Sequence, residues 1–227
     1  MNGGQGGFAT HYWDCCKPSC AWPDKPGSGP IESCDQNNNS FGGDYNQQSN
    51  CSGGGAFQCW GFHPRALNSR YAIGWAAFNS GQCGECYQLD FSGQSSSGYN
   101  DPGAASLAGK VMIVQVINTG GIAGNQFDLL VPGGGVGDFN ACSTQWGGTD
   151  LGDQYGGWFT QCRNQNAGNN QGAVDCVKNK CNSNFSGKSD LLEGCLFWAE
   201  WAKVADNPSF NFAKVNCPSE ITSVSKR

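Results

Sequence analysis

Histidine and charged residues are scarce in this chain of 227 residues. It contains two histidines, His11 and His63, and only 14% of its residues are charged. Two histidines argue against a zinc site built on histidine, and they leave few options for a serine–histidine–aspartate triad. The net charge is −5 and no basic patch is present, which argues against a nucleic-acid partner. No apolar run approaches the roughly 18 residues that a membrane span requires, so we expect no membrane partner.

Cysteine and glycine are instead abundant, with 14 cysteines and 35 glycines. An even cysteine count favours a framework of disulfides and an oxidising, extracellular compartment. The residues at the start, 1–7, contain no apolar signal region, so secretion implies a signal peptide removed earlier. The pair Cys83 and Cys86 has the spacing of a zinc or redox site, but a lone pair among twelve other cysteines is weak evidence. We therefore expect a secreted, cross-linked protein with no metal.

The sequence shows no linker to a second module, and we expect one domain over residues 10–220. Residues 1–9 are predicted to be a flexible segment and residues 221–227 a polar tail. Strand patterns cover residues 86–91, 110–118, 126–132 and 207–215, with the apolar run 197–201 leading into the last. Short helices are predicted within 64–78 and 137–146. Many short strands, glycine turns and cysteines favour a mainly β fold, a small closed barrel with long loops and a few short helices.

The run of residues 10–20, Thr-His-Tyr-Trp-Asp-Cys-Cys-Lys-Pro-Ser-Cys, is the most informative stretch. Cys15, Cys16 and Cys20 are too close in sequence to pair with one another without strain, since a disulfide requires Cα atoms roughly 4.4–6.8 Å apart in a specific geometry. We expect them to tie the segment to three distant parts of the fold. Asp14 would then be held rigidly, as an acid or base in catalysis must be. The alternative is that Asp14 is only a turn residue beside a disulfide knot.

A second carboxylate, Asp128, precedes the glycine-rich loop 133–137. The loop lacks the Lys-Ser/Thr pair of a phosphate-binding loop and the GxGxxG spacing, so a structural turn is the better interpretation. Cysteines that are all oxidised cannot supply a thiol nucleophile. Two carboxylates without a serine–histidine pair favour glycoside hydrolysis, in which one acid and one base suffice.

Tryptophan is also frequent, with eight residues. Six of them lie in polar, glycine-rich surroundings: Trp13, Trp22, Trp60, Trp75, Trp146 and Trp158. Exposed aromatic faces of this kind would suit stacking on the apolar faces of pyranose rings. For any one of them, packing in the core is an equally good explanation.

The run 10–20 resembles the N-terminal signature of the endoglucanases of glycoside hydrolase family 45. Phe127-Asp128-Leu129, followed by the segment 132–137, resembles that family's second signature. The segments 206–210 and 217–218 also match, and the resemblance spans about residues 10–220. It implies a six-stranded double-psi β-barrel with an open groove and hydrolysis of β-1,4-glucan with inversion. No cofactor, linker or carbohydrate-binding module is expected, and we expect a monomer.

The resemblance also assigns roles to residues. Asp14 would be the general base that activates water, and Asp128 the general acid that protonates the leaving oxygen. An inverting pair should stand roughly 6.5–9.5 Å apart. The acid should occupy the more apolar or crowded site, so that it stays protonated. The residues expected to bind substrate are Thr10, Tyr12, Lys17, Trp22, Gln126 and Tyr155.

The family's pattern further implies five disulfides, Cys15–Cys142, Cys16–Cys51, Cys20–Cys83, Cys34–Cys59 and Cys86–Cys217. The other four cysteines, Cys162, Cys176, Cys181 and Cys195, allow three sets of pairs, and the sequence does not choose among them. Asn-x-Ser sequons at Asn38, Asn50 and Asn184 could carry glycans.

The chain departs from the family at the loop 120–124, where many members carry an additional aspartate. This loop has no carboxylate, and Asp138 could replace it. Gln126 stands where a histidine is common. An expansin-like protein that binds glucan without cleaving it is the main alternative, but that class lacks the base that Asp14 provides. A lectin-like barrel of barwin type explains the cysteines but not the paired aspartates.

Overall fold

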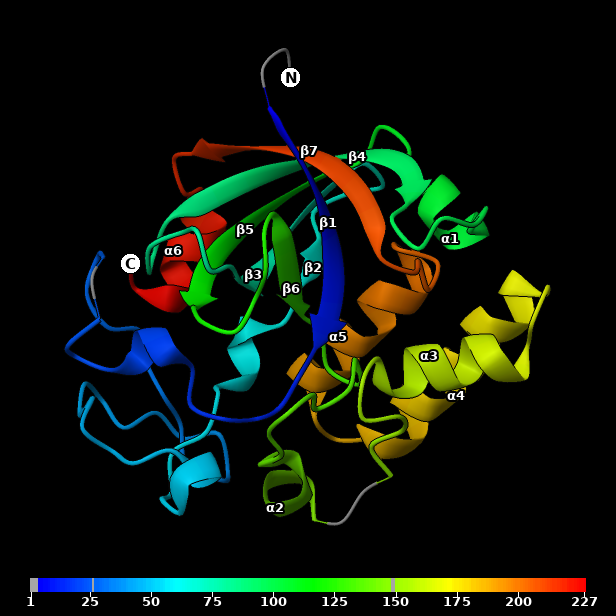
Figure 1. Cartoon of the computed structure of the whole chain (residues 1–227). Helices are drawn as coiled ribbons and strands as arrows, with labels where there is room; N and C mark the ends of the chain where they lie inside the picture. The colour runs from blue at the N-terminus through cyan, green and yellow to red at the C-terminus, as the bar shows by residue number, and fades with distance from the viewer. Residues whose placement is uncertain (1–3, 26, 148–149) are drawn as a thin grey trace.

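The computed structural model describes residues 4–25, 27–147 and 150–227 (Figure 1). The described chain contains a seven-stranded sheet, six α-helices and three short 3-10 helices. The strands are β1 (Gln5–Tyr12), β2 (Arg65–Ala66), β3 (Tyr71–Ala77), β4 (Cys86–Ser95), β5 (Val111–Asn118), β6 (Gln126–Leu130) and β7 (Pro208–Val215). The helices are α1 (Pro102–Ala105), α2 (Cys142–Trp146), α3 (Gly157–Gln165), α4 (Asn170–Asn184), α5 (Ser189–Glu200) and α6 (Ser219–Ser225).

The strands pair in the order β2-β3-β5-β4-β7-β1-β6. A further antiparallel pairing joins β3 to β6 through Ala76 with Leu129 and Ala77 with Asp128. Six strands therefore pair in a ring, while the two-residue strand β2 lies outside it. The pairs β1–β6 and β3–β5 are parallel and the others antiparallel. This is a mainly β fold compatible with the expected double-psi barrel.

Aromatic side chains fill part of the core inside this ring. Phe78 stacks on Phe127 with ring centroids 3.9 Å apart, and Phe212 meets Phe127 edge-on at 5.0 Å. The edge-on arrangement is a favoured geometry for aromatic pairs. Phe127, on β6, is fully buried, and the alternation of the strand directs its neighbours Gln126 and Asp128 to the other face. Packing of Phe127 therefore determines which way Asp128 points.

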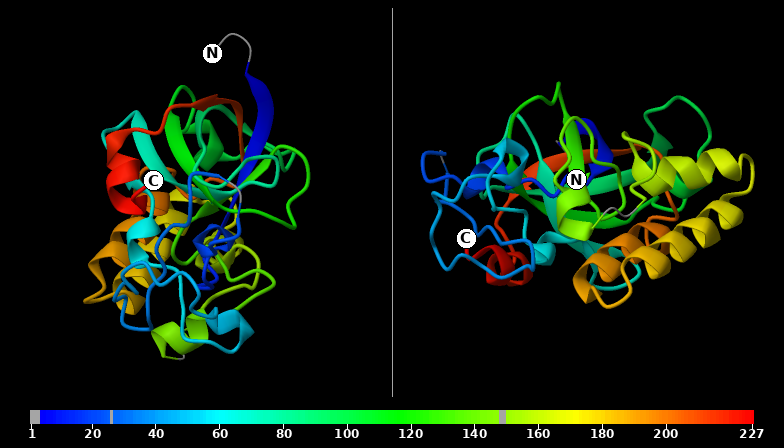
Figure 2. Two further views of the ribbon diagram at one scale, coloured as in Figure 1. Left: turned by 90° about the vertical axis from the view of Figure 1, so that its left-hand side faces the viewer. Right: turned by 90° about the horizontal axis from the view of Figure 1, so that it is seen from below.

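Helices α3, α4 and α5 pack side by side to one side of the barrel (Figures 1 and 2). The disulfide Cys162–Cys176 joins α3 to α4, and Cys181–Cys195 joins α4 to α5. These two bridges select one of the three sets that the sequence left open. The other five bridges in the structure are the pairs that the family resemblance implies: Cys15–Cys142, Cys16–Cys51, Cys20–Cys83, Cys34–Cys59 and Cys86–Cys217.

Four expected strands and the short helix within 137–146 are present, but several local predictions are wrong. The segment 64–78 forms β2 and β3 rather than a helix, because a short apolar run fits a buried strand as well as a buried helix. The run 197–201 closes helix α5 rather than approaching a strand.

The two ends of the chain also differ from the prediction. Residues 5–8 pair with β7, so most of the expected flexible segment belongs to the sheet; residues 1–3 lie outside the described part. The expected polar tail contains most of α6, which is held in place by the fully buried Ile221. No helix in the described ranges is long and apolar enough to cross a bilayer.

Candidate active site

A cavity of about 850 Å³ lies beside the end of β1 and contains both candidate carboxylates. Its volume is within the usual range for ligand pockets. Its walls come from the ends of β1, β3 and β5, the loop 119–122, the start of β6, the glycine-rich loop and the segments before α3 and β7. Its lining residues include Thr10, His11, Tyr12, Asp14, Asn118, Gln126, Asp128, Asp138, Phe139, Tyr155, Asp206 and Asn207.

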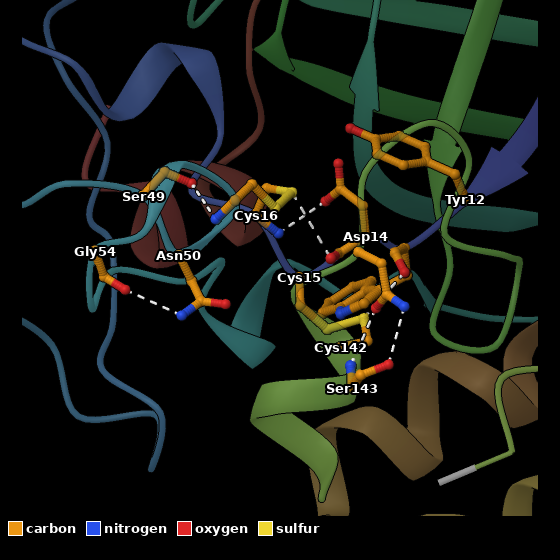
Figure 3. The surroundings of a disulfide bond; sticks show 12 residues. Tyr12, Asp14, Cys15, Cys16, Ser49, Asn50, Gly54, Cys142 and Ser143 are labelled. Atoms are coloured by element: carbon orange, nitrogen blue, oxygen red, sulfur yellow. Dashed lines mark hydrogen bonds between the residues drawn. A yellow bond between two sulfur atoms is a disulfide. The ribbon is translucent and has the colours of Figure 1, made fainter. Parts of the chain in front are cut away.

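Two hydrogen bonds from backbone N–H groups fix Asp14, one to its carbonyl and one to its carboxylate. Its carbonyl accepts the N–H of Ala141 at 2.8 Å, and its Oδ1 accepts the N–H of Cys16 at 2.9 Å. Cys15, between them, has a φ of 61°, a left-handed conformation that costs a non-glycine residue about 1–3 kcal/mol. Disulfides from Cys15 and Cys16 to distant segments hold this conformation (Figure 3). The cysteines therefore anchor the carboxylate.

Burial dominates the electrostatics of Asp14, whose side chain is only 8% exposed. Loss of solvation raises its pKa to about 7, although the hydrogen bond from Cys16 acts in the opposite direction. The ring of Tyr12 lies close to this carboxylate in Figure 3. Burial, and then the charge of Asp14, raise the pKa of the Tyr12 hydroxyl well above its usual value. That hydroxyl accepts a hydrogen bond from Asn118 Nδ2 at 3.0 Å.

Asp128 enters the cavity from β6, where it is the register partner of Thr10 in the parallel pairing with β1. The hydroxyl of Thr10 donates to Asp128 Oδ1. Gln126 Nε2, two residues earlier on the same face, donates to the same oxygen at 2.5 Å. Both donors bind one oxygen of the carboxyl, which fixes its orientation and leaves Oδ2 available.

The expectation that Asp128 occupies the more apolar site is wrong. Asp14 is buried, whereas Asp128 is partly exposed. The reason is local: Asp14 lies within the disulfide knot after β1, while Asp128 sits on a strand whose polar face borders the cavity and carries Gln126.

The glycine-rich loop packs backbone against backbone, as a structural turn does. A Cβ on Gly135 would lie 2.6–2.7 Å from backbone atoms of residues 154, 156 and 157, and its φ is +94°. Gly135 also accepts the N–H of Trp13 at 2.7 Å, one residue before Asp14. The loop therefore links the segment that carries Asp14 to the segment before α3.

Of the residues predicted to bind substrate, Thr10, Tyr12, Gln126 and Tyr155 line the cavity. Lys17 and Trp22 are not among its lining residues in the described chain. The Lys17 side chain is buried, and its Nζ donates to the carbonyls of Tyr45 and Gln47 at 2.6 and 2.9 Å. The same ammonium lies 3.5 Å from the ring centroid of Trp22. Lys17 thus ties Trp22 to the loop 44–47.

Most of the tryptophans considered for sugar stacking belong to the core. Trp13, Trp75, Trp146 and Trp158 are buried, and only Trp22 and Trp60 are partly exposed. The large exposed aromatic side chains at the cavity are instead Tyr155 and Phe139.

Sequence reasoning missed two features of the cavity wall. His11 packs edge-on against Phe159 and Trp198, and burial lowers its pKa to about 4, so it is neutral at ordinary pH. Asp206, also in the wall, forms an ion pair of 2.7 Å with Arg163 of α3. Asp206 lies in a segment that matches the family, but nothing in the sequence singles out Arg163. Among the described residues, no cluster of three or more histidine, cysteine or acidic side chains could hold a metal ion.

A pair of carboxylates in one cavity is the arrangement that most glycoside hydrolases use. The sequence model described as "Glycosyl hydrolase family 45" matches residues 6–226. The chain belongs to this family.

Individual relatives agree with this assignment. Endoglucanase B of Cellvibrio japonicus is 48% identical over 98% of this chain and 45% of its own length. An endoglucanase of the springtail Cryptopygus antarcticus is 37% identical over 97% of this chain and 88% of its own length. The crystal structure of the cellulase from that springtail superposes with a TM-score of 0.75 at 35% identity, covering 97% of this chain and 95% of the other. This chain spans about half the length of the Cellvibrio protein.

Proposed function

We propose that this protein is a secreted endo-β-1,4-glucanase that inverts the anomeric carbon, with Asp14 as general base and Asp128 as general acid. The observation that carries the proposal is that both aspartates line one cavity, Asp14 from the disulfide-linked segment after β1 and Asp128 from β6. The relatives named as endoglucanases support β-1,4-glucan as the proposed substrate class. The seven disulfides support secretion, because such bridges persist in oxidising compartments.

The role of Asp14 as base is proposed from its position in the family's first motif, and its burial is compatible with that role. Desolvation that raises the pKa to about 7 also makes the ionised carboxylate a stronger proton acceptor than an ordinary aspartate. A water between Asp14 and the anomeric carbon would give up its proton to this carboxylate as it attacks. The N–H of Cys16 fixes one oxygen of the carboxylate and leaves the other for the water.

The two donors on Asp128 suit an acid that must present its proton in one direction. Thr10 and Gln126 both bind Oδ1, so a proton on the carboxyl resides on Oδ2. That proton would pass to the glycosidic oxygen while the bond to the anomeric carbon breaks. The separation of the two carboxyl groups is then expected to be roughly 6.5–9.5 Å, with room for the water.

Substitution tests the activity directly. Asp14→Asn and Asp128→Asn should each abolish release of reducing ends from soluble β-glucan, while circular dichroism shows the fold intact. Full activity of either variant would overturn the assignment. Absence of new reducing ends with the parent protein, together with retained binding, would favour the non-hydrolytic, expansin-like alternative.

A second substrate separates the two roles. An aryl cello-oligoside with an acidic phenol as leaving group needs no protonation, so Asp128→Asn should recover much of its activity on it. Asp14→Asn should remain inactive, because attack by water still needs a base. The opposite pattern would exchange the roles. Proton NMR of the first product, as the α anomer, tests inversion.

The proposed domain is a single catalytic unit, now extended to the strand that begins at Gln5 and the helix that ends at Ser225. We propose that it acts as a monomer and needs no cofactor.

A further inference from the structure

Tyr155 and Asp138 form an exposed pair at the cavity, contributed by two different segments. Tyr155 precedes α3 and is 65% exposed, and Asp138 follows the glycine-rich loop. The Tyr155 hydroxyl donates to Asp138 Oδ1 at 2.6 Å. Phe139, next to Asp138, is 61% exposed and lines the same cavity. Two large aromatic rings and one carboxylate thus meet at this wall.

The backbones that carry the pair are fixed to each other. The N–H of Gly137 donates to the carbonyl of Gln154 at 2.9 Å, and Gln154 Nε2 donates to the carbonyl of Gly137 at 2.9 Å. These backbone contacts do not fix the side-chain torsions of Tyr155. Within the described ranges, its hydroxyl has no hydrogen-bond partner other than Asp138, and its ring packs on no other aromatic ring.

We propose that Asp138 is a positioning residue that holds the Tyr155 ring as a platform for one glucosyl unit of the bound chain. The inference rests on the proposed function, since it takes β-1,4-glucan as the ligand. An exposed tyrosine that rotates freely loses conformational entropy when a sugar orders it, which weakens binding. A ring ordered beforehand avoids that loss.

The pairing also sets the chemistry of the hydroxyl. A carboxylate only accepts hydrogen bonds, so the proton of Tyr155 is committed to Asp138. The hydrogen bond to Asp138, and then the charge of Asp138, raise the pKa of the Tyr155 hydroxyl, which keeps this proton in place. The phenolic oxygen can therefore only accept a hydrogen bond from a sugar. A sugar hydroxyl bound here must act as the donor.

This role differs from that of the loop aspartate that the family often carries and this chain lacks. A carboxylate that assists the reaction would lower kcat when removed. A positioning residue acts through Tyr155 and changes binding instead. The two roles are therefore separable by kinetics.

The test is a double-mutant cycle on cello-oligosaccharides with Asp138→Ala, Tyr155→Phe and both together. Each single variant should raise KM roughly three- to tenfold and leave kcat within about twofold, which is the range expected for one immobilised side chain. The double variant should be no worse than either single one, because both remove the same bond. Asp138→Asn should restore most of the loss, since its amide oxygen still accepts. Asp153→Ala removes a nearby exposed carboxylate of the same charge and should leave KM unchanged.

Repeating the series in the Asp14→Asn background separates this inference from the proposed function. Calorimetric Kd values for cello-oligosaccharides then report binding without turnover, whatever the reaction is. A Kd unchanged by Asp138→Ala would overturn the positioning role. Additive effects in the cycle, or a fall in kcat with KM preserved, would also overturn it, and the latter would make Asp138 a replacement for the loop aspartate.

Discussion

Thr10 and Asp128 face each other across the parallel pairing of β1 and β6, and the threonine hydroxyl donates to the aspartate. Thr10→Val keeps the shape of the side chain and removes that donor. Gln126 alone would then orient the carboxyl, so we expect kcat to fall about tenfold or more with little change in the melting temperature. Thr10→Ser retains the hydroxyl and should stay close to the parent. An equal loss in both variants would show that the methyl group, and not the donor, matters.

The buried carboxyl of Asp14 predicts a pH dependence of activity. Its pKa of about 7 means that the proposed base is mostly protonated at pH 5 and mostly ionised at pH 8. In Asp128→Asn acting on the aryl cello-oligoside, where no acid is needed, kcat/KM should therefore rise through an apparent pKa near 7. A profile that is already flat from pH 5 upward would contradict either the burial of Asp14 or its role as base.

The same group predicts a pH dependence of stability, with a definite sign. Its pKa is raised on folding from about 3.8, so the folded state binds more protons between pH 4 and pH 7. This group's contribution to stability is therefore lost as pH rises through that window and stays absent above it. Asp14→Asn keeps an acceptor for the Cys16 N–H but carries no charge. Its unfolding free energy should match the parent near pH 4 and exceed it by up to a few kcal/mol at pH 8. Chemical denaturation at both pH values measures the difference.

Strands whose pattern lies within a few consecutive residues could be predicted from the sequence, whereas elements held by distant contacts could not. The β-branched run of β5 and the alternation of β4 are visible in the chain itself, and both strands are present. Helix α4 was missed because its buried residues, Ala173, Val174, Val177 and Cys181, form a narrow stripe in a polar sequence that two disulfides hold in place.

The same distinction applies to the residues of the candidate site. Asp14 and Asp128 lie in dense local motifs and could be found from the sequence. The burial of Asp14, the pairing of Arg163 with Asp206 and the core packing of Trp75 and Trp158 arise only from contacts between distant segments. These contacts are not visible without the folded structure.

The disulfide Cys15–Cys142 is expected to matter for both stability and activity. It closes 127 residues, for which chain entropy predicts a contribution of about 4–5 kcal/mol, and it holds Cys15 in its left-handed conformation beside Asp14. Replacing both cysteines with alanine should lower the melting temperature and also reduce kcat at a temperature where the variant is folded. The matched control removes Cys162–Cys176, which spans 14 residues between α3 and α4. It should lower stability by less and leave kcat unchanged. An equal effect on kcat would show that the anchoring of Asp14 does not depend on the nearby bridge.

Gly135 and Gly137 offer a matched pair for the role of the glycine-rich loop. Both have positive φ, and so alanine strains the backbone at either position. At Gly135 the new Cβ would also meet backbone atoms of the segment before α3 at 2.6–2.7 Å, whereas at Gly137 it would meet nothing within 4 Å. Backbone cannot rotate away as a side chain can, so Gly135→Ala must separate the loop from that segment. Because Gly135 also accepts the N–H of Trp13, this movement reaches Asp14. We expect Gly137→Ala to cost about 1–2 kcal/mol and retain most activity, and Gly135→Ala to cost several kcal/mol and lose most kcat. Chemical denaturation and initial rates on β-glucan measure both quantities, and similar behaviour of the two variants would show that the close approach at Gly135 is not what positions the base.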